Sequence, residues 1–178
     1  GSLVACAVLG QIALVTVIAA SFARGSAMHR FIARYALPLA FAIALSATAG
    51  SLFYSEIAGF TPCTLCWYQR IVLYPQVVLF ALALWKHDAT VWRYSAALSG
   101  IGALIAGYQT LLQYNLVPSA LCSSASVSCT QRFVMGFSYI TIPMMSLTAF
   151  VLLLLLALVS FTSHQFSRTN STIGVGLQ

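Results

Sequence analysis

Charged residues are scarce in this sequence, and acidic residues are almost absent. Only 6% of the 178 residues are Asp, Glu, Lys or Arg, and only two of these are acidic. Soluble domains average roughly 25% charged residues, so this chain has too few to cover a surface that faces water. The sequence also lacks internal repeats and the period-2 alternation that marks a membrane barrel. These absences exclude a soluble globular domain and a transmembrane barrel.

Long apolar runs make up most of the chain, which is 61% hydrophobic. About 18 or more apolar residues are enough for a helix to cross the hydrocarbon core of a bilayer. The sequence predicts five such spans, at about Leu3–Phe22, Tyr35–Tyr54, Trp67–Trp85, Tyr94–Tyr114 and Tyr139–Phe161. Prolines in these spans are expected to start or kink helices, because neighbouring helices can satisfy the freed carbonyl groups: Pro38, Pro75 and Pro143. We therefore predict an all-α integral membrane bundle in a lipid bilayer.

The first window, Leu3–Phe22, could instead be the apolar part of a secretory signal. Such a region is roughly 7–15 residues long and follows a charged leader. This window is longer, and no basic leader precedes it. We therefore expect it to be a transmembrane helix.

The net charge of +6 is distributed unevenly between the two sides of the predicted spans. Arg70 and Arg132 fall on one side, and the other six basic residues fall on the opposite side: Arg24, Arg30, Arg34, Lys86, Arg93 and Arg168. Because Lys and Arg are retained on the cytoplasmic side, we expect the amino end outside and the carboxyl end in the cytoplasm. The charge is then a topology signal, and no nucleic-acid partner is expected.

Four of the five cysteines fall in the two loops that this orientation places outside, Glu56–Cys66 and Asn115–Ser138. Disulfides form and persist outside the cytoplasm, whereas cytosolic thiols are kept reduced. Basic-residue bias and cysteine placement therefore give the same orientation. The fifth cysteine, Cys6, stands alone in an apolar window and is expected to be a small buried hydrophobic residue.

Cys63 and Cys66 form a Cys-x-x-Cys pair where the third window begins. Thr61 suits an N-cap and Pro62 the first helical position, which would place both cysteines in the opening turn. The free N–H groups and the helix dipole there favour a thiolate, the species that attacks disulfides or quinones. Arg70 follows on the same helical face and could stabilise a thiolate or a reduced quinone oxygen. Alternatively, Arg70 only extends its guanidinium to the lipid headgroups.

Cys122 and Cys129 bracket the polar segment Ser123–Ser128. A static disulfide would close a short loop and remove little unfolded-state entropy, so a mobile pair that exchanges with a partner and with Cys63 and Cys66 is the better explanation. Zinc is another use for four cysteines. However, six residues separate Cys122 from Cys129, whereas zinc pairs are typically two to four apart, and the setting is oxidising. No metal is therefore expected.

Gln109 and Gln113 lie one turn apart in the fourth window, with Tyr108 beside them. Amides inside a membrane often only hydrogen-bond neighbouring helices, but these two could equally hold a quinone carbonyl. The histidines fall on the cytoplasmic side, too far from the cysteines to act as base or ligand: His29, His87 and His164. The candidate site residues are Cys63, Cys66, Cys122, Cys129, Arg70, Gln109 and Gln113.

The segment Cys63-Thr64-Leu65-Cys66-Trp67-Tyr68-Gln69-Arg70, followed by Tyr74-Pro75, resembles the signature of bacterial disulfide bond formation proteins of the DsbB/BdbC type. The start of that family's last helix is similar to Gly136-Phe137, Thr141-Ile142-Pro143, Ser146-Leu147 and Ala149-Phe150. The Cys122…Cys129 loop and Leu112-Gln113 also match in order. The resemblance covers roughly Tyr35–Phe161.

This resemblance implies a four-helix redox domain at 35–161 in a bacterial plasma membrane, with both cysteine pairs in periplasmic or extracellular loops. Residues 1–34 would add a transmembrane helix and a basic cytoplasmic loop, and 162–178 a cytoplasmic tail. Cys122–Cys129 would accept electrons from a reduced thioredoxin-fold thiol oxidase of the DsbA type, and Cys63–Cys66 would reoxidise that pair. Cys66 would deliver the electrons to ubiquinone or menaquinone beside Arg70.

Two features depart from this family. Many members carry His where Gln109 stands, and a neutral amide cannot supply a proton as imidazolium can. The Leu3–Phe22 span is also extra to a four-helix fold.

Two alternatives remain. A vitamin K epoxide reductase-like enzyme also pairs cysteines with a quinone, but its loop cysteines precede the membrane Cys-x-x-Cys, whereas here they follow it. A non-catalytic membrane protein would use the cysteines structurally or to bind metal, and stoichiometric metal would reveal it.

Overall fold

The computed structural model describes residues 10, 16–17, 27–59, 61–86, 88, 90–114, 116 and 142–175, and for residues 27–30, 142 and 162–175 it describes the backbone alone. These residues form four long helices, α2 (Ala27–Leu52), α3 (Thr64–Lys86), α4 (Val91–Gln113) and α5 (Ile142–Val175). A short π-helical segment, η1 (Phe53–Ile57), continues α2. No strand occurs in these ranges, and the predicted all-α fold is confirmed.

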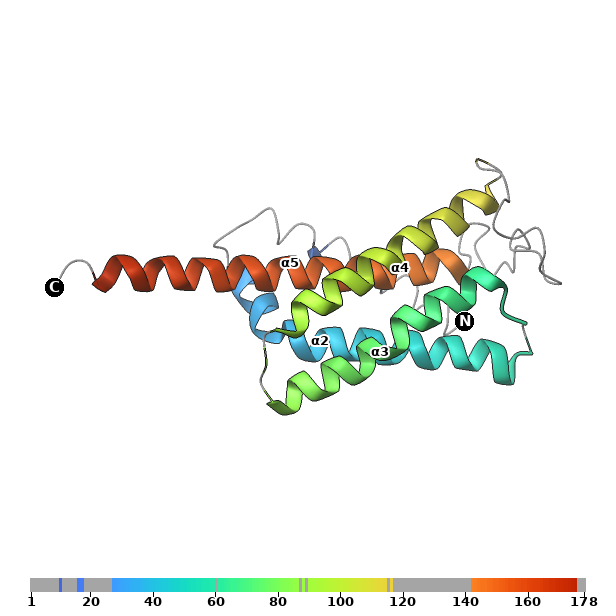
Figure 1. The fold of residues 1–178 in the computed structure, drawn as a ribbon, viewed down its shortest axis with the longest axis horizontal. Helices are drawn as coiled ribbons and strands as arrows, with labels where there is room; N and C mark the ends of the chain where they lie inside the picture. Colours follow the sequence, from blue (N-terminus) through green and yellow to red (C-terminus); the bar gives the residue numbers. More distant parts are fainter. Residues whose placement is uncertain are drawn as a thin grey trace.

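The four long helices form a closed bundle in which each helix packs against two others. α3 contacts α2 and α4, and α5 contacts α4 and α2. Successive helices run in opposite directions, as Figure 1 shows, which is the up-down-up-down arrangement. The end of α2, the start of α3, the end of α4 and the start of α5 therefore meet at one end of the bundle. At the other end α5 extends far beyond its neighbours (Figure 1).

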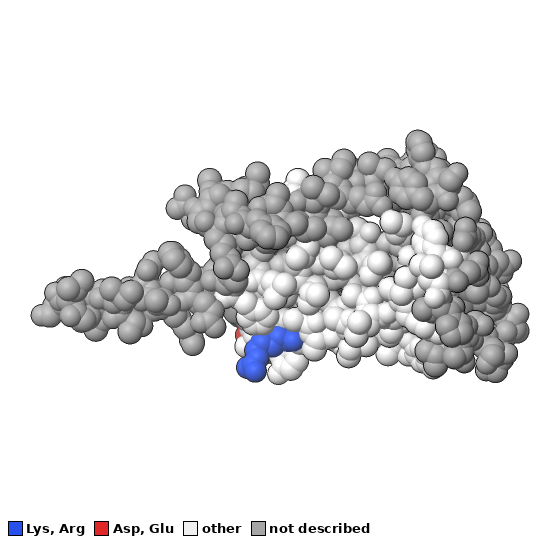
Figure 2. Space-filling view, turned by 90° about the horizontal axis from the view of Figure 1, so that it is seen from above, with Lys and Arg blue, Asp and Glu red and all other residues white. Residues whose placement is uncertain are grey.

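Four segments are long and apolar enough to cross a membrane: Phe31–Ile57, Thr64–Lys86, Val91–Gln113 and Pro143–Phe161. On the face shown in Figure 2, the Lys and Arg side chains of the described residues gather in one place, and most of the remaining described surface is uncharged. Trp67 and Trp85 are exposed near the two ends of α3. Their separation is about 27 Å along the helix, close to the thickness of the hydrocarbon core. The chain is a multi-pass membrane protein.

Helix α2 begins at Ala27, ahead of the expected Tyr35, so Arg30 and Arg34 belong to its first turns. Helix α5 runs to Val175 and thus includes most of the residues expected in the tail. The predicted span Leu3–Phe22 lies outside the described residues except for three helical positions, Gly10, Thr16 and Val17.

None of the three prolines ends a membrane-spanning helix, and Pro143 starts one as predicted. Pro38 lies inside α2 and Pro75 inside α3, and both helices continue past them. Pro143 is the second residue of α5, where its missing N–H needs no helical partner.

Close approach between helices depends on small residues. Ala36, Ala40 and Ala44 follow one another at four-residue spacing on α2 and are almost fully buried. Gly102 on α4 faces the ring of Phe150 on α5, and a Cβ atom at Gly102 would lie 2.4 Å from Phe150 Cε1. The α4–α5 contact therefore requires glycine at this position.

A polar cluster joins α3 to α4 within the bundle. Gln76 is fully buried and donates to the carbonyl of Val72 at 3.0 Å. Its Oε1 accepts hydrogen bonds from the hydroxyls of Ser95 at 3.1 Å and Ser99 at 3.0 Å. Such bonds stabilise membrane helix pairs because lipid offers polar groups no alternative partner.

Candidate active site

Cys63 and Cys66 lie at the start of α3, as predicted, but the helix begins later than its sequence indicates. The carbonyl of Cys63 accepts a hydrogen bond from the backbone N–H of Trp67 at 3.1 Å, which makes Cys63 the N-cap and Thr64 the first helical residue. The prediction that Thr61 is the N-cap and Pro62 the first helical residue was wrong. Cys66 still lies in the first turn, where the helix dipole favours a thiolate.

The two sulfur atoms lie 2.9 Å apart as hydrogen-bonded thiols. Cys63 is buried, with an exposed fraction of 6%, and packs with Leu65 and Leu112 in a small apolar cluster. Its hydrogen bond with Cys66 and its burial both raise the pKa of the Cys63 thiol above the ordinary value. Cys63 therefore loses its proton less readily than an ordinary thiol.

Gln109 reaches this pair from α4. Its Nε2 atom donates to Cys63 Sγ at 3.3 Å and to Cys66 Sγ at 3.4 Å. The amide is buried, with an exposed fraction of 3%. Gln109 therefore links α4 to α3, as one of its two predicted roles required, and it also contacts both sulfurs; the quinone contact stays a prediction.

Two further side chains complete a hydrogen-bonded chain. Gln69 on α3 donates through Nε2 to Gln109 Oε1 at 2.7 Å. The hydroxyl of Ser146 on α5 lies 2.6 Å from Gln69 Oε1, to which it donates, and 2.9 Å from the carbonyl oxygen of Pro143. Three helices therefore contribute to the surroundings of one thiol pair.

Arg70 lies one turn after Cys66 and is directed toward the end of α2. Its Nε donates to Ser51 Oγ at 2.9 Å and its Nη2 to the Ser51 carbonyl at 2.8 Å. The guanidinium carbon also lies 5.2 Å from the centre of the Trp67 ring. With an exposed fraction of 8%, the side chain is buried, which argues against extension to the headgroups.

The end of α2 provides the acceptor for Arg70. The π-helical segment η1 starts two residues after Ser51, and the Ser55 hydroxyl also approaches the Ser51 carbonyl, at 3.4 Å. π-Helical turns are rare and are often found at functional sites. Here the turn follows the residue that anchors the only arginine of α3.

Several hydrogen-bond donors at and near Arg70 have no partner among the described residues. Ser51 uses two of the five N–H groups of the guanidinium, and the described residues provide no hydrogen-bond partner for the others. One helical turn away along α2 and α3, Thr48 Oγ1 and Tyr74 Oη are buried and have no hydrogen-bond partner among the described residues. Buried polar groups are normally paired, so these donors suit a ligand that carries oxygen acceptors, such as a quinone.

The other predicted site residues are placed as follows. Gln113 is buried one turn after Gln109, and Gln109 makes the hydrogen bonds that link α4 to the sulfurs. Cys122 and Cys129 lie outside the described residues, as does Cys6. Within the described ranges no three His, Cys, Asp or Glu residues are grouped to hold a metal ion.

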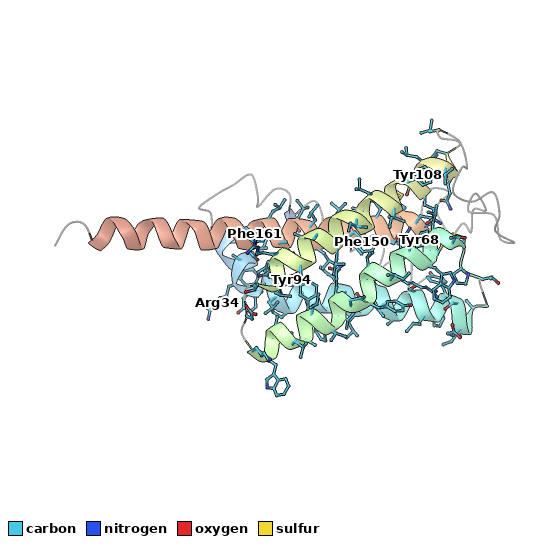
Figure 3. All side chains as sticks on the ribbon, viewed as in Figure 1. Arg34, Tyr68, Tyr94, Tyr108, Phe150 and Phe161 are labelled. Atoms are coloured by element: carbon cyan, nitrogen blue, oxygen red, sulfur yellow. The ribbon has the colours of Figure 1, made fainter. Side chains whose placement is uncertain are left out.

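Gln69 and Ser146 were not among the residues predicted for the site, although both lie in segments that resemble the family. A signal for Gln69 was available, because it follows Cys66 by three residues and so lies near it on the helix surface. Ser146 had no comparable signal, because its link to Gln69 joins residues 77 positions apart. In Figure 3, Tyr68 of α3 and Tyr108 of α4, each adjacent in sequence to a glutamine of this site, mark the same end of the bundle, opposite Arg34 and Phe161.

A Cys-x-x-Cys pair, with Cys63 buried and Cys66 partly exposed, lies at the end of a four-helix membrane bundle and defines the chain as a membrane-embedded thiol–disulfide protein. Residues 33–160 match the family described as "Disulfide bond formation protein DsbB", and the chain belongs to this family. Membership in this family implies disulfide oxidoreductase activity. It also disfavours the alternative of a vitamin K epoxide reductase-like enzyme.

Curated relatives agree with the family match. The chain is 36% identical over 125 residues to the "Probable disulfide formation protein" of Metapseudomonas resinovorans, covering 69% of this chain and 87% of the relative. It is 41% identical over 115 residues to the "SPbeta prophage-derived disulfide bond formation protein B" of Bacillus subtilis strain 168, covering 65% and 78%. The "Probable disulfide formation protein C 1" of Bacillus anthracis is 40% identical over 118 residues, covering 66% and 85%. No solved structure gives a significant match.

Proposed function

We propose that this chain is a membrane thiol oxidase that converts the dithiol of a partner protein to a disulfide and passes the electrons to a membrane quinone. The observation that carries the proposal is the arrangement of one thiol pair and one buried cation at the start of α3. The sulfurs of Cys63 and Cys66 are in contact, and Gln109 donates a hydrogen bond to each of them. Arg70 follows one turn later, and Ser51 engages only two of its five N–H groups. This arrangement suits reversible disulfide formation next to an electron acceptor that becomes anionic when it is reduced.

Electrons would enter through the second cysteine pair. A thiolate of the partner, a thioredoxin-fold oxidase of the DsbA type, attacks the Cys122–Cys129 disulfide, and the resulting mixed disulfide is resolved by the partner's second thiol. The reduced loop pair then transfers its electrons to the Cys63–Cys66 disulfide by the same exchange. Each S–S bond formed replaces one broken, so two electrons and two protons move from the partner to Cys63 and Cys66.

The reoxidation of Cys63 and Cys66 requires a two-electron acceptor. Ubiquinone or menaquinone supplies that capacity when bound. Arg70, Tyr74 and Thr48 are the residues that would hold its oxygen atoms, because the Tyr74 and Thr48 hydroxyls are buried without partners among the described residues and Ser51 engages only two N–H groups of Arg70. Cys66, which lies one turn before Arg70, is the residue that would give up electrons first.

The basic-residue bias supports a position of these sites on the outer side of a bacterial plasma membrane. Arg34, Lys86 and Arg93 belong to the opposite end of the bundle from Cys63. With Lys and Arg on the cytoplasmic side, both cysteine loops face the periplasm or the exterior, and α5 ends in the cytoplasm.

The test is quinone reduction by the purified full chain, given a reduced thioredoxin-fold oxidase and either ubiquinone or menaquinone. We expect turnover with at least one quinone, and we expect Cys66→Ser to abolish it. Cys6→Ser is the matched control, because it removes a cysteine that belongs to neither pair, and it should retain full turnover.

Absence of turnover with both quinones, in protein shown to be folded by its helical circular dichroism, would overturn the proposal. Metal analysis of the same preparation would then test the metal-binding alternative. Turnover that survives in Cys66→Ser would equally contradict the role given to this pair.

A further inference from the structure

The hydrogen-bonded chain that ends on the sulfur pair has a single direction. Ser146 donates to Gln69 Oε1, Gln69 Nε2 donates to Gln109 Oε1, and Gln109 Nε2 donates to both sulfurs. Each amide thus accepts at its oxygen and donates at its nitrogen. Every dipole in the chain points its positive end toward Cys63 and Cys66.

This direction determines which end of the Gln109 amide meets the sulfurs. A side-chain amide can turn over and exchange its oxygen and nitrogen positions. With its oxygen held by the Gln69 donor, Gln109 presents its NH₂ group to the sulfurs. In the reversed orientation, its carbonyl oxygen would face the sulfurs and repel a thiolate. Gln69 therefore controls whether Gln109 stabilises or destabilises the negative charge.

Because both amides are buried, the orientation of the Gln109 amide strongly affects the charge on the sulfurs. The exposed fractions are 7% for Gln69 and 3% for Gln109, so water competes little for these groups. Hydrogen bonds in such surroundings are electrostatically stronger and polarise one another along a chain. Donors directed at a sulfur stabilise the thiolate, which exists only in the reduced state of the pair. A stabilised reduced state makes the corresponding disulfide a stronger oxidant.

We propose that Gln69 and Ser146 are positioning residues that hold the Gln109 amide with its donors on Cys63 and Cys66, and that this chain sets the reduction potential of the pair. The inference rests on the proposed function, in which the Cys63–Cys66 disulfide must oxidise the loop cysteines. It assigns a role to two residues that touch neither sulfur.

The test is a redox titration of the full chain in detergent against dithiothreitol buffers. Free thiols are alkylated, and the fraction of oxidised Cys63–Cys66 is read by mass spectrometry of the peptide that contains both. Gln109→Leu should shift the equilibrium constant toward the disulfide by roughly tenfold or more, because it removes donors to a charged group. A tenfold shift corresponds to a potential about 30 mV lower. Gln69→Leu and Ser146→Ala should shift it in the same direction by roughly twofold to tenfold.

The chain offers a matched control in Ser99→Ala. Ser99 makes the same kind of contact as Ser146, a hydroxyl donated to a glutamine Oε1, but its partner Gln76 belongs to the other polar cluster. Ser99 lies ten residues before Gln109 on α4, about 15 Å along the helix. Its replacement should leave the potential of Cys63–Cys66 unchanged.

Combining substitutions tests whether the residues act in series. Ser146→Ala should shift the potential in the wild-type background and cause no further shift in the Gln109→Leu background. If Ser146→Ala and Gln69→Leu leave the potential unchanged while Gln109→Leu shifts it, the positioning role is wrong. A further shift by Ser146→Ala in the absence of the Gln109 amide would also overturn it.

The titration uses neither quinone nor partner, so it separates this inference from the proposed function. A pair that titrates and shifts as described but shows no quinone turnover would overturn the function and leave the positioning role in place. If Gln69→Leu does not fold, the milder Ser146→Ala still decides the outcome, because it removes only one hydroxyl.

Discussion

Arg70 and Ser51, 19 residues apart in the chain, are joined by two hydrogen bonds, of which one ends on the Ser51 hydroxyl and one on its carbonyl oxygen. The pair ties the second turn of α3 to the last turn of α2. It also fixes the guanidinium beside the cysteine-bearing turn without using all of its N–H groups. The position of the cation therefore depends on α2 as much as on α3.

Replacement of Arg70 by lysine tests this arrangement. Arg70→Lys keeps the charge but loses the fork that meets Ser51, since an ammonium is a flexible point charge. We expect kcat/KM for quinone to fall by roughly tenfold to a hundredfold, the value of about one hydrogen bond to a charged group. Ser51→Ala removes only the hydroxyl contact and should cost less. Initial rates against quinone concentration measure both, and an equal loss in the two variants would contradict the prediction.

Gly102 should not tolerate a side chain. In Gly102→Ala, the added methyl group would overlap the Phe150 ring, so α4 and α5 would have to separate. Overpacking of this kind typically costs about 1–3 kcal/mol of folding free energy. Gly100→Ala is the control, because a Cβ atom there meets no atom within 4 Å. Thermal unfolding in detergent should show a lower midpoint for Gly102→Ala alone; matching midpoints would refute the packing argument.

The losses of folding free energy caused by Ser95→Ala and Ser99→Ala should not be additive, because both hydroxyls donate to Gln76 Oε1. Either alanine substitution leaves the oxygen one donor, so each should cost only about 0.6 kcal/mol, the average for such bonds between membrane helices. The double substitution leaves a buried acceptor unsatisfied, so it should cost more than the two single substitutions added together, up to about 3 kcal/mol. Unfolding of the two single variants and the double variant completes the cycle. A double variant equal to the sum of the singles would show that the donors act independently.

Alkylation of Cys63 should require a higher pH than alkylation of an ordinary thiol. Its raised pKa means that less thiolate is present at any given pH, and only the thiolate reacts. The hydrogen bond with Cys66 is the largest cause, so Cys66→Ser should move the profile to lower pH, while burial keeps it above that of a free thiol. The rate of iodoacetamide modification at Cys63, followed by mass spectrometry between pH 6 and 10, measures both effects. A profile unmoved by Cys66→Ser would contradict the assignment.

Much of the bundle could be predicted from composition alone. Four of the five expected spans coincide with described helices, because the bilayer sets their length and the apolar windows are unambiguous. Helix starts were less predictable. Thr61 and Pro62 have the residue types of a helix start, yet α3 starts at Thr64. Capping preference is a local signal, and it does not by itself decide between neighbouring starts.

Part of the candidate site could also be predicted from the sequence. Cys63, Cys66 and Arg70 share one helix, so their spacing reports their proximity. Gln109 was a candidate because an amide inside a membrane span needs a partner. Ser146 and Ser51 could not be identified, because their contacts depend on how α5 and α2 are placed against α3. The sequence carries no periodicity that reports such pairings between helices.

The position of the thiol pair near one end of α3 determines how far the transmembrane voltage can affect its reaction. Cys63, Cys66 and Arg70 all belong to the first turns of the helix, while the second polar cluster around Gln76 lies further along it. Electron transfer between sulfurs and an acceptor held there begins and ends on one side of the bilayer. Moving a unit charge through a transmembrane voltage of 100 mV costs about 2.3 kcal/mol, but a reaction confined to one side moves no charge through it. If the proposed function holds, a cell could therefore change its membrane voltage widely without altering how readily this protein oxidises its partner.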